Sequence, residues 1–298
     1  MEKKYTKNNK QGLLIGRHIS LIKPGYLLDA ARKAVFDYGS NSFMIYLGSP
    51  QSSFREDINN LKIEDFKQFI FDNSVNIRNV IVHGSYLVNF GNYGDYGKLL
   101  WSIRFMKSDL LKMEKIGLET MVIHPGNFLN LDKKKSILSI SKSIDEILSS
   151  VSGVRIALEM MPGSGTQIGK NFDEIKLIID NSIFNDRLGV CWDTCHLYSS
   201  GYDIKNNFET VLEEFNNKIG IGKLWVIHLN DSNFGLGSKK DSHANIGLGC
   251  LGLECLASIA HNKKLNNSIK ILETPVNNEI CKSEIENIKD FQKYKENS

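Results

Sequence analysis

Val80-Ile81-Val82-His83 is a short apolar run that ends in a histidine, and similar runs return five more times along the chain. Each of them ends in a histidine, a glutamate or an aspartate: Met121-Val122-Ile123-His124, Ile156-Ala157-Leu158-Glu159, Leu188-Gly189-Val190-Cys191-Trp192-Asp193, Trp225-Val226-Ile227-His228 and Ile269-Lys270-Ile271-Leu272-Glu273. The spacing between successive runs is that of one strand, one helix and two loops. One potential metal ligand therefore follows each repeated strand-and-helix unit.

These runs predict buried parallel strands, because they are rich in Val, Ile and Leu and show little polar alternation. Two earlier strands are expected at residues 13–16 and 42–46, which brings the total to eight. Helical patterns lie between the strands, at 26–36, 99–116, 136–148, 172–179, 208–215, 253–260 and 283–294. Strands that alternate with helices favour a (β/α)8 TIM barrel, in which the strand ends converge on one face. We expect a metal site at the C-terminal ends of the strands.

Two further segments add ligand types to this face. Asp193 is followed by His196, one helical turn later, and Asp241-Ser242-His243 lies in a glycine-rich stretch that indicates a loop. The candidate metal ligands are all histidines or carboxylates: His83, His124, Glu159, Asp193, His196, His228, Asp241, His243 and Glu273.

Nine such residues exceed the needs of one metal ion, since a catalytic zinc takes about three protein ligands and a water. Two or three ions could be held, and imidazole with carboxylate suits zinc, manganese or iron. A single histidine at a strand end is more often a satisfied polar group, so the hypothesis depends on the recurrence. Glu159 and Glu273 could instead form salt bridges across the mouth of the barrel. Cys191 and Cys195 are expected to be packed rather than to bind metal.

The rest of the composition indicates a single domain. The chain has 298 residues, and a barrel of this kind takes about 250. We predict a disordered basic tail at 1–12 and one barrel domain at 13–298. The sequence contains no apolar stretch of the kind that predicts a signal peptide or a membrane span. Its five cysteines indicate reduced thiols. An intracellular protein is therefore expected, in cytoplasm or nucleoid or in a viral particle or factory. A net charge of +3 does not indicate nucleic-acid binding by charge alone.

The chain closely resembles the endonuclease IV family of apurinic/apyrimidinic endonucleases. The resemblance is carried by segments in family order from residue 13 to 275: the stretch 82–89 around His83-Gly84-Ser85-Tyr86-Leu87, His124-Pro125-Gly126, Leu158-Glu159, the stretch 191–203 around Asp193-Thr194-Cys195-His196, His228-Leu229-Asn230-Asp231-Ser232, Asp241-Ser242-His243-Ala244-Asn245-Ile246-Gly247-Leu248-Gly249 and Leu272-Glu273-Thr274-Pro275.

The resemblance implies a TIM barrel with three zinc ions, with manganese possible at some sites. The first ion would be held by His83, His124 and Glu159. The second would be held by Glu159, Asp193, His228 and Glu273, with Glu159 as the bridge. The third would be held by His196, Asp241 and His243. Glu159 and Glu273 would be the catalytic residues.

The implied reaction belongs to base excision repair. The enzyme would hydrolyse the phosphodiester 5′ to an abasic site in duplex DNA and leave a 3′-hydroxyl and a 5′-deoxyribose phosphate. A hydroxide that bridges two cations would be the nucleophile, because metal binding lowers the pKa of water. The expected partner is double-stranded DNA with abasic sites, bound by a monomer that has no contact with membranes.

The resemblance also implies contacts to DNA. Tyr86 and Leu87 match a pair that inserts at the abasic site. Gln51 stands in a loop, 47–55, where many relatives place an arginine, and Arg55 could replace that charge. His18 follows the first strand and is expected to line the mouth as a DNA contact.

Two departures from the family also concern DNA. Ser242 stands where relatives carry arginine, and Lys239 and Lys240 could substitute for it with less specific geometry. Met160-Met161-Pro162 replaces the usual residues after Glu159.

Two alternatives stay open at this point. A sugar isomerase or epimerase of the xylose-isomerase-like barrels also places histidines and carboxylates at strand ends, but it would leave His196, Asp241 and His243 without a role. A non-catalytic metal- or DNA-binding protein on a degenerate barrel would be expected to have lost at least one of the nine ligands.

Overall fold

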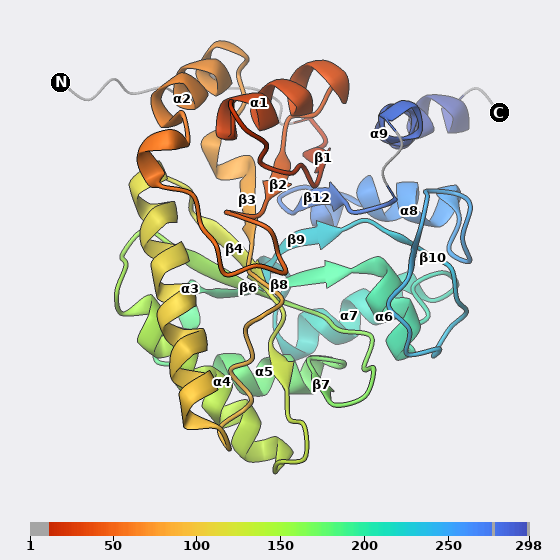
Figure 1. Ribbon diagram of the computed structural model, residues 1–298. Helices are drawn as coiled ribbons and strands as arrows, with labels where there is room; N and C mark the ends of the chain where they lie inside the picture. Colours follow the sequence, from red (N-terminus) through yellow and green to blue (C-terminus); the bar gives the residue numbers. More distant parts are fainter. Residues whose placement is uncertain (1–11, 276–277, 297–298) are drawn as a thin grey trace.

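Eight parallel strands form a barrel at the centre of the computed structural model, which describes residues 12–275 and 278–296 (Figure 1). The strands are β1 (Ile15–Arg17), β2 (Phe43–Ile45), β3 (Val80–His83), β4 (Thr120–Ile123), β6 (Arg155–Glu159), β8 (Leu188–Asp193), β9 (Leu224–His228) and β12 (Ile269–Leu272). They are hydrogen-bonded in the order β1-β12-β9-β8-β6-β4-β3-β2. A parallel bridge between His18 and Met44 connects β1 with β2, the two ends of this order. The predicted (β/α)8 barrel is confirmed.

The helices lie around the ring of strands in Figure 1. They are α1 (Leu27–Arg32), α2 (Ile63–Asp72), α3 (Tyr96–Ile116), α4 (Lys133–Leu148), α5 (Phe172–Asp180), α6 (Thr194–Ser200), α7 (Phe208–Lys218), α8 (Leu253–Ala260) and α9 (Asn278–Glu296). A π-helical turn, Lys33–Asp37, extends α1, and five short 3-10 turns lie at Ile58–Asn60, Ile77–Asn79, Asn185–Arg187, Ile221–Lys223 and Lys263–Leu265.

All seven predicted helices are present, and α2 and α6 are additional. Helix α2 buries Phe66 and Ile70 one turn apart on its inner face, which is a signal that the sequence contains. Helix α6 starts directly after β8, because the Asp193 side chain caps it by accepting a hydrogen bond from the His196 amide at 2.9 Å. Strand and helix meet there without a loop, and this is why the pattern shows no separate helix.

Two small antiparallel ribbons shape the loops that follow the barrel strands. Strand β5 (Gly126–Asn127) pairs with β7 (Gln167–Ile168), and β10 (Asp231–Ser232) pairs with β11 (His243–Ala244). The second ribbon holds His243 beside the loop that follows β9.

Several expectations concern the ends of the chain and its surroundings. The predicted tail falls on residues 1–12, and residues 1–11 lie outside the described part of the chain. Among the described residues, no helix combines the length and apolar character that crossing a bilayer requires. The five cysteines are all unpaired thiols.

Candidate metal centre and active site

The alternation of side chains along each strand directs the candidate ligands into the mouth of the barrel. Ile81 belongs to the apolar cluster inside the barrel, whereas Val80 and Val82 pack between the strands and the helices. His83 therefore faces inward like Ile81, since side chains two residues apart share a face. The other strand-end ligands follow the same rule, each two positions after an inward-facing residue: His124 after Val122, Glu159 after Ala157, Asp193 after Cys191, His228 after Val226 and Glu273 after Ile271.

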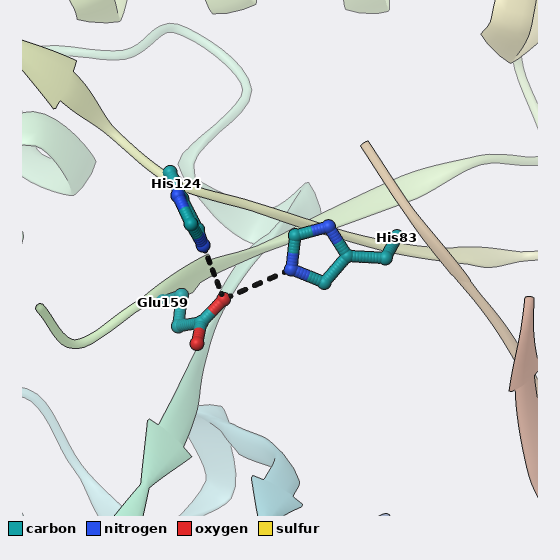
Figure 2. Close-up of side chains that lie close together, drawn as sticks. All are labelled: His83, His124 and Glu159. Carbon is teal, nitrogen blue, oxygen red and sulfur yellow. Dashed lines mark hydrogen bonds and ion pairs between the residues drawn. The ribbon is translucent and has the colours of Figure 1, made fainter. Parts of the chain in front are cut away.

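The first cluster joins the ends of β3, β4 and β6. Figure 2 shows His83 and His124 pointing at the same carboxylate oxygen of Glu159. The Oε2 atom of Glu159 lies 3.1 Å from Nε2 of His83 and 3.3 Å from Nε2 of His124. His83 and Glu159 are buried, and His124 is about a quarter exposed at 28%. The cluster thus has one side open to solvent.

The second cluster uses the other oxygen of Glu159. Its Oε1 atom lies 3.2 Å from Nδ1 of His228, and this nitrogen is 3.1 Å from Oε2 of Glu273. Asp193 is also within reach, with 4.0 Å between its Oδ2 atom and the same nitrogen. Glu159 therefore stands between two ligand clusters with one oxygen toward each, which is the position of a bridging carboxylate.

The third cluster combines α6 with the β10–β11 ribbon. Nε2 of His243 lies 3.3 Å from Oδ2 of Asp193, and Nε2 of His196 lies 3.1 Å from Oδ1 of Asp241. The ligand atoms of Asp193, His196 and His243 all lie within 4.8 Å of one another. Asp241, which the resemblance places here, is 45% exposed at the rim, with its Oδ1 atom 3.5 Å from His243. All nine sequence candidates meet at this face of the barrel.

The electrostatics of these clusters favour bound cations. Burial alone would raise the pKa of Glu159, but the charges of His228 and His124 and the close contacts with His124 and His196 together outweigh burial and hold that pKa well below its ordinary value. Burial also opposes protonation of His243, yet the charge of Asp193, the close contact with that carboxylate and the charge of Glu273 together outweigh burial and raise the pKa to about 9. Burial likewise opposes protonation of His196, but Asp193, Asp241 and Glu159 together raise its pKa well above its ordinary value. The carboxylates thus stay ionised and hold positive charge next to them.

Asn230 is a site residue that the sequence analysis does not identify. Its side-chain amide donates to Oδ2 of Asp193 at 2.7 Å, and its Oδ1 accepts from the backbone amide of Glu273 at 2.8 Å. It follows His228 by two positions, so the alternation along β9 is the signal that could have found it. The same amide nitrogen also lies 3.4 Å from Oε2 of Glu273, so Asn230 contacts the carboxylates at the ends of both neighbouring strands.

The altered segment after β6 contributes through its backbone. Nδ1 of His196 lies 3.0 Å from the carbonyl oxygen of Met160, and both Met160 and Met161 are buried. A backbone contact does not depend on the identity of the side chain. The departure from the usual sequence at this segment is therefore compatible with the position of His196.

A cavity of about 530 Å³ opens above the clusters and is lined by His18, Tyr46 and Tyr86 beside the ligands. Tyr86 is 48% exposed, and its hydroxyl accepts a 2.5 Å hydrogen bond from Tyr46. The Nε2 atom of His18 is buried without a hydrogen-bond partner, and burial lowers the pKa of His18 to about 4, so its ring is neutral. Leu87 is 42% exposed next to Tyr86, and Gln51 is exposed on the loop after β2.

Arg55 does not replace the arginine that relatives carry near Gln51. Its guanidinium forms a two-pronged ion pair with Asp109 of α3, with Nε and Nη2 2.9 to 3.1 Å from the carboxylate. Both side chains are buried. The sequence does not show this pairing, because Asp109 lies on helix α3, 54 residues further along the chain.

Ser242 and the neighbouring lysines lie on the rim. The Ser242 hydroxyl accepts a hydrogen bond from the Asn233 amide at 3.1 Å. Lys240 places its ammonium 4.1 Å from the centre of the Phe234 ring, and Lys239 is exposed. The two lysines directly precede Asp241 in the chain, and their substitution for the missing arginine stays a prediction.

Comparisons with known proteins agree with this fold and site. The model of a family described as "Xylose isomerase-like TIM barrel" matches residues 32–291. The probable endonuclease 4 of Geobacillus kaustophilus is 40% identical over 263 residues, which is 88% of this chain and 87% of the relative. The corresponding protein of Enterococcus faecalis is also 40% identical, with 88% of each chain covered.

Solved structures show the same relationship. The crystal structure of endonuclease IV from Thermus thermophilus has a TM-score of 0.81 at 27% identity and covers 95% of this chain and 99% of its own. A D-tagatose 3-epimerase-like protein shares the fold alone, with a TM-score of 0.69 at 18% identity.

Fold and site thus define an enzyme of the xylose isomerase-like TIM-barrel class. Within that class, the chain belongs to the endonuclease IV family. This membership confirms the resemblance that the sequence motifs indicate, and with it the expectation that the protein is a nuclease rather than a sugar isomerase or a protein without catalytic activity.

Proposed function

We propose that the protein is a zinc-dependent endonuclease that hydrolyses the phosphodiester 5′ to abasic sites in duplex DNA, in base excision repair. The products would be a 3′-hydroxyl and a 5′-deoxyribose phosphate. One observation carries the proposal: three adjacent ligand clusters share the carboxylates of Glu159 and Asp193 at the open face of the barrel. The partner would be double-stranded DNA, bound by a monomer inside the cell.

The donor set fits zinc. Within residues 12–275 and 278–296, neither lysine nor arginine forms an ion pair with Glu159, Asp193 or Glu273, and their only ion-pair partners are histidines. Buried carboxylates without a fixed cation are costly, so this site is built to receive cations. The Nε2 atoms of His196 and His243 are buried and face carboxylate oxygens at 3.1 and 3.3 Å without forming hydrogen bonds, as ligands around one ion would. Imidazole and carboxylate are zinc ligands, and manganese is compatible with the carboxylates.

Three ions would be held by the three clusters, with His196, Asp241 and His243 around the third. Zinc supplies Lewis acidity, which lowers the pKa of water and neutralises the charge that develops on a phosphate under attack. The Glu273 carboxylate is 14% exposed and lines the cavity, whereas Glu159 is buried. Glu273 would therefore accept a hydrogen bond from the attacking water, and Glu159 would hold neighbouring ligands in position.

The residues that would contact DNA surround the cavity. Tyr86 and Leu87 present half-exposed apolar side chains beside the first cluster, as insertion into a base stack requires. An abasic site lowers the cost of this step, because the base to be displaced is already missing. His18 would meet the sugar or phosphate as a neutral ring, and Gln51 would provide an uncharged contact from the loop after β2.

The third cluster favours this reaction over that of a sugar isomerase. A sugar isomerase with the same barrel and one metal site would account for His83, His124 and Glu159. It would not account for the convergence of His196 and His243 on Asp193. Three cations near one phosphate suit phosphodiester hydrolysis, in which charge builds up on several oxygens at once.

The proposal is tested by incision of a duplex that carries one tetrahydrofuran abasic analogue. Metal-loaded protein should cut 5′ to the analogue, contain about three zinc ions per chain and lose activity on exhaustive chelation. Glu159→Gln should lower the metal content and abolish incision. Glu119→Gln, which changes a carboxylate paired with Arg78 outside the site, is the matched control and should retain both. Intact abasic DNA after incubation with fully loaded wild type would refute the proposal.

A further inference from the structure

An exposed aromatic side chain on α3 has no role in the site described so far. Trp101 is 41% exposed, although tryptophan carries the largest apolar surface of any residue. It stacks on Phe105, one turn further along the helix, with the ring centroids 5.0 Å apart and the planes 10° from parallel. Part of the indole surface thus remains free for a further partner.

The stack has a rigid backing. The guanidinium carbon of Arg55 lies 4.5 Å from the centre of the Phe105 ring, and the buried ion pair with Asp109 holds that guanidinium in place. Arg55, Phe105 and Trp101 therefore form a preorganised set of planar groups that spans the loop after β2 and helix α3. Preorganisation lowers the entropy that a binding partner must lose.

Trp101 lines a groove of about 370 Å³ together with Ser53, Leu87, Asn92 and Lys98. The groove extends the face of the metal site, since Leu87 directly follows Tyr86 of the main cavity. The loop that carries Leu87 is attached to α3 by a hydrogen bond from the amide of Asn89 to the hydroxyl of Ser102, at 3.4 Å.

We propose that this groove, the Trp101 groove, binds an unpaired nucleobase of the DNA substrate next to the lesion. The inference rests on the proposed function, which places Tyr86 and Leu87 in the base stack. An apolar side chain that inserts into a duplex leaves a neighbouring base unstacked, and that base needs a new partner for its face. The indole provides one for any base, because every base has a π-face.

The polar lining of the groove matches the rest of a nucleotide. Ser53 and Asn92 carry hydroxyl and amide groups that can bond to the edge of a base. Lys98 is 76% exposed and forms a surface ion pair with Asp95 at 3.1 Å, which a phosphate could replace at little cost. Aromatic face, amide and ammonium together favour a nucleotide over an apolar partner.

The test compares two duplexes that both contain the tetrahydrofuran analogue. One is otherwise fully paired, and the other has a mismatch in the base pair beside the analogue. Wild type should bind the mismatched duplex more tightly, because its neighbouring base is already unpaired. Trp101→Ala should lower the affinity for the mismatched duplex about fivefold or more, and it should then bind the two duplexes equally well. Trp101→Phe should keep most of the preference for the mismatched duplex.

Two further variants complete the experiment. Tyr96→Ala removes another exposed aromatic of α3 that does not line the groove, and it should behave like wild type. Trp101→Leu keeps an apolar contact with Phe105 but has no aromatic face, so it should lose the preference even if Trp101→Ala folds poorly. Binding of the mismatched duplex should also quench tryptophan emission in wild type, and Trp101→Phe should lack this change.

Two outcomes would overturn the inference. One is an equal preference for the mismatched duplex in wild type, Trp101→Ala and Trp101→Leu. The other is a concentration-dependent dimer of wild type that Trp101→Ala abolishes without changing DNA affinity, since the groove would then bind a second copy of the chain. Both leave incision of the paired duplex intact, whereas failure of the proposed function would abolish incision of both duplexes by wild type.

Discussion

The buried ion pair between Arg17 and Glu284 should be among the most destabilising contacts to break. Arg17 is 1% exposed at the end of β1, and its Nη1 atom lies 3.6 Å from Oε2 of Glu284 on α9. The carboxylate also accepts hydrogen bonds from the Thr274 hydroxyl at 2.7 Å, from the Asn245 side chain at 2.9 Å and from the Ile246 amide at 2.8 Å. One side chain thus connects α9 with the segments that follow Glu273 and His243.

Glu284→Ala would leave an unpaired buried guanidinium and several unsatisfied donors. Removing one partner of a buried pair costs about 3–5 kcal/mol. For a chain of 298 residues each kcal/mol lowers the thermal midpoint by roughly 1.6 °C, so a fall of about 5–8 °C is expected. Arg17→Met should cost a similar amount. The double variant Arg17→Met/Glu284→Ala should be more stable than the sum of the two single effects would predict, because it no longer buries an unpaired charge.

The assay is a double-mutant cycle by urea and thermal denaturation of the metal-free protein. Glu209→Gln is the matched control, because its ion pair with Lys264 is exposed on both sides and should contribute at most about 1 kcal/mol. Additive effects of the changes at 17 and 284, or a cost for Glu284→Ala no larger than that of the control, would show that the pair does not stabilise the fold. The reasoning about α9 would then be wrong.

Four further outcomes are expected. Glu273→Gln should retain DNA binding but lower turnover by orders of magnitude, measured by single-turnover incision; near-normal turnover would remove this carboxylate from the reaction. Tyr86→Ala combined with Leu87→Ala should weaken binding to abasic duplex, by about 1–3 kcal/mol for each base that is no longer stacked on a side chain, while zinc content by mass spectrometry stays unchanged. Ser242→Arg should make the log–log salt slope of duplex binding more negative by about 0.9, and an unchanged slope would show that this position does not face a phosphate. The pKa of His243 is about 9 in the folded metal-free protein, against 6.5 for the free side chain. Protonated His243 therefore stabilises the folded state fully below pH 6.5, and this stabilisation is lost as the pH rises through 9. The thermal midpoint of the metal-free protein should decrease over this interval. The decrease should be smaller in His243→Ala, because His196, whose pKa is also raised, remains.

Much of the candidate metal site could be predicted from the chain alone. Alternation along a strand is a local property. Ile81 and His83 are two positions apart, so their side chains face the same side of the strand. The same spacing of two residues recurs at each strand end, and parallel strands in a barrel bring those ends together. The sequence therefore determined the fold, the face that carries the site and the ligand types.

Contacts between distant segments were decided only by the tertiary structure. Arg55 has a free charge when the loop after β2 is considered by itself, but helix α3 supplies Asp109 and buries both groups. Both contacts of Asn230 likewise exist only because β8 and β12 place Asp193 and Glu273 on either side of it. The physical reason is that periodicity sets the direction of a side chain relative to its own backbone, whereas the partner it meets depends on how separate elements pack against one another.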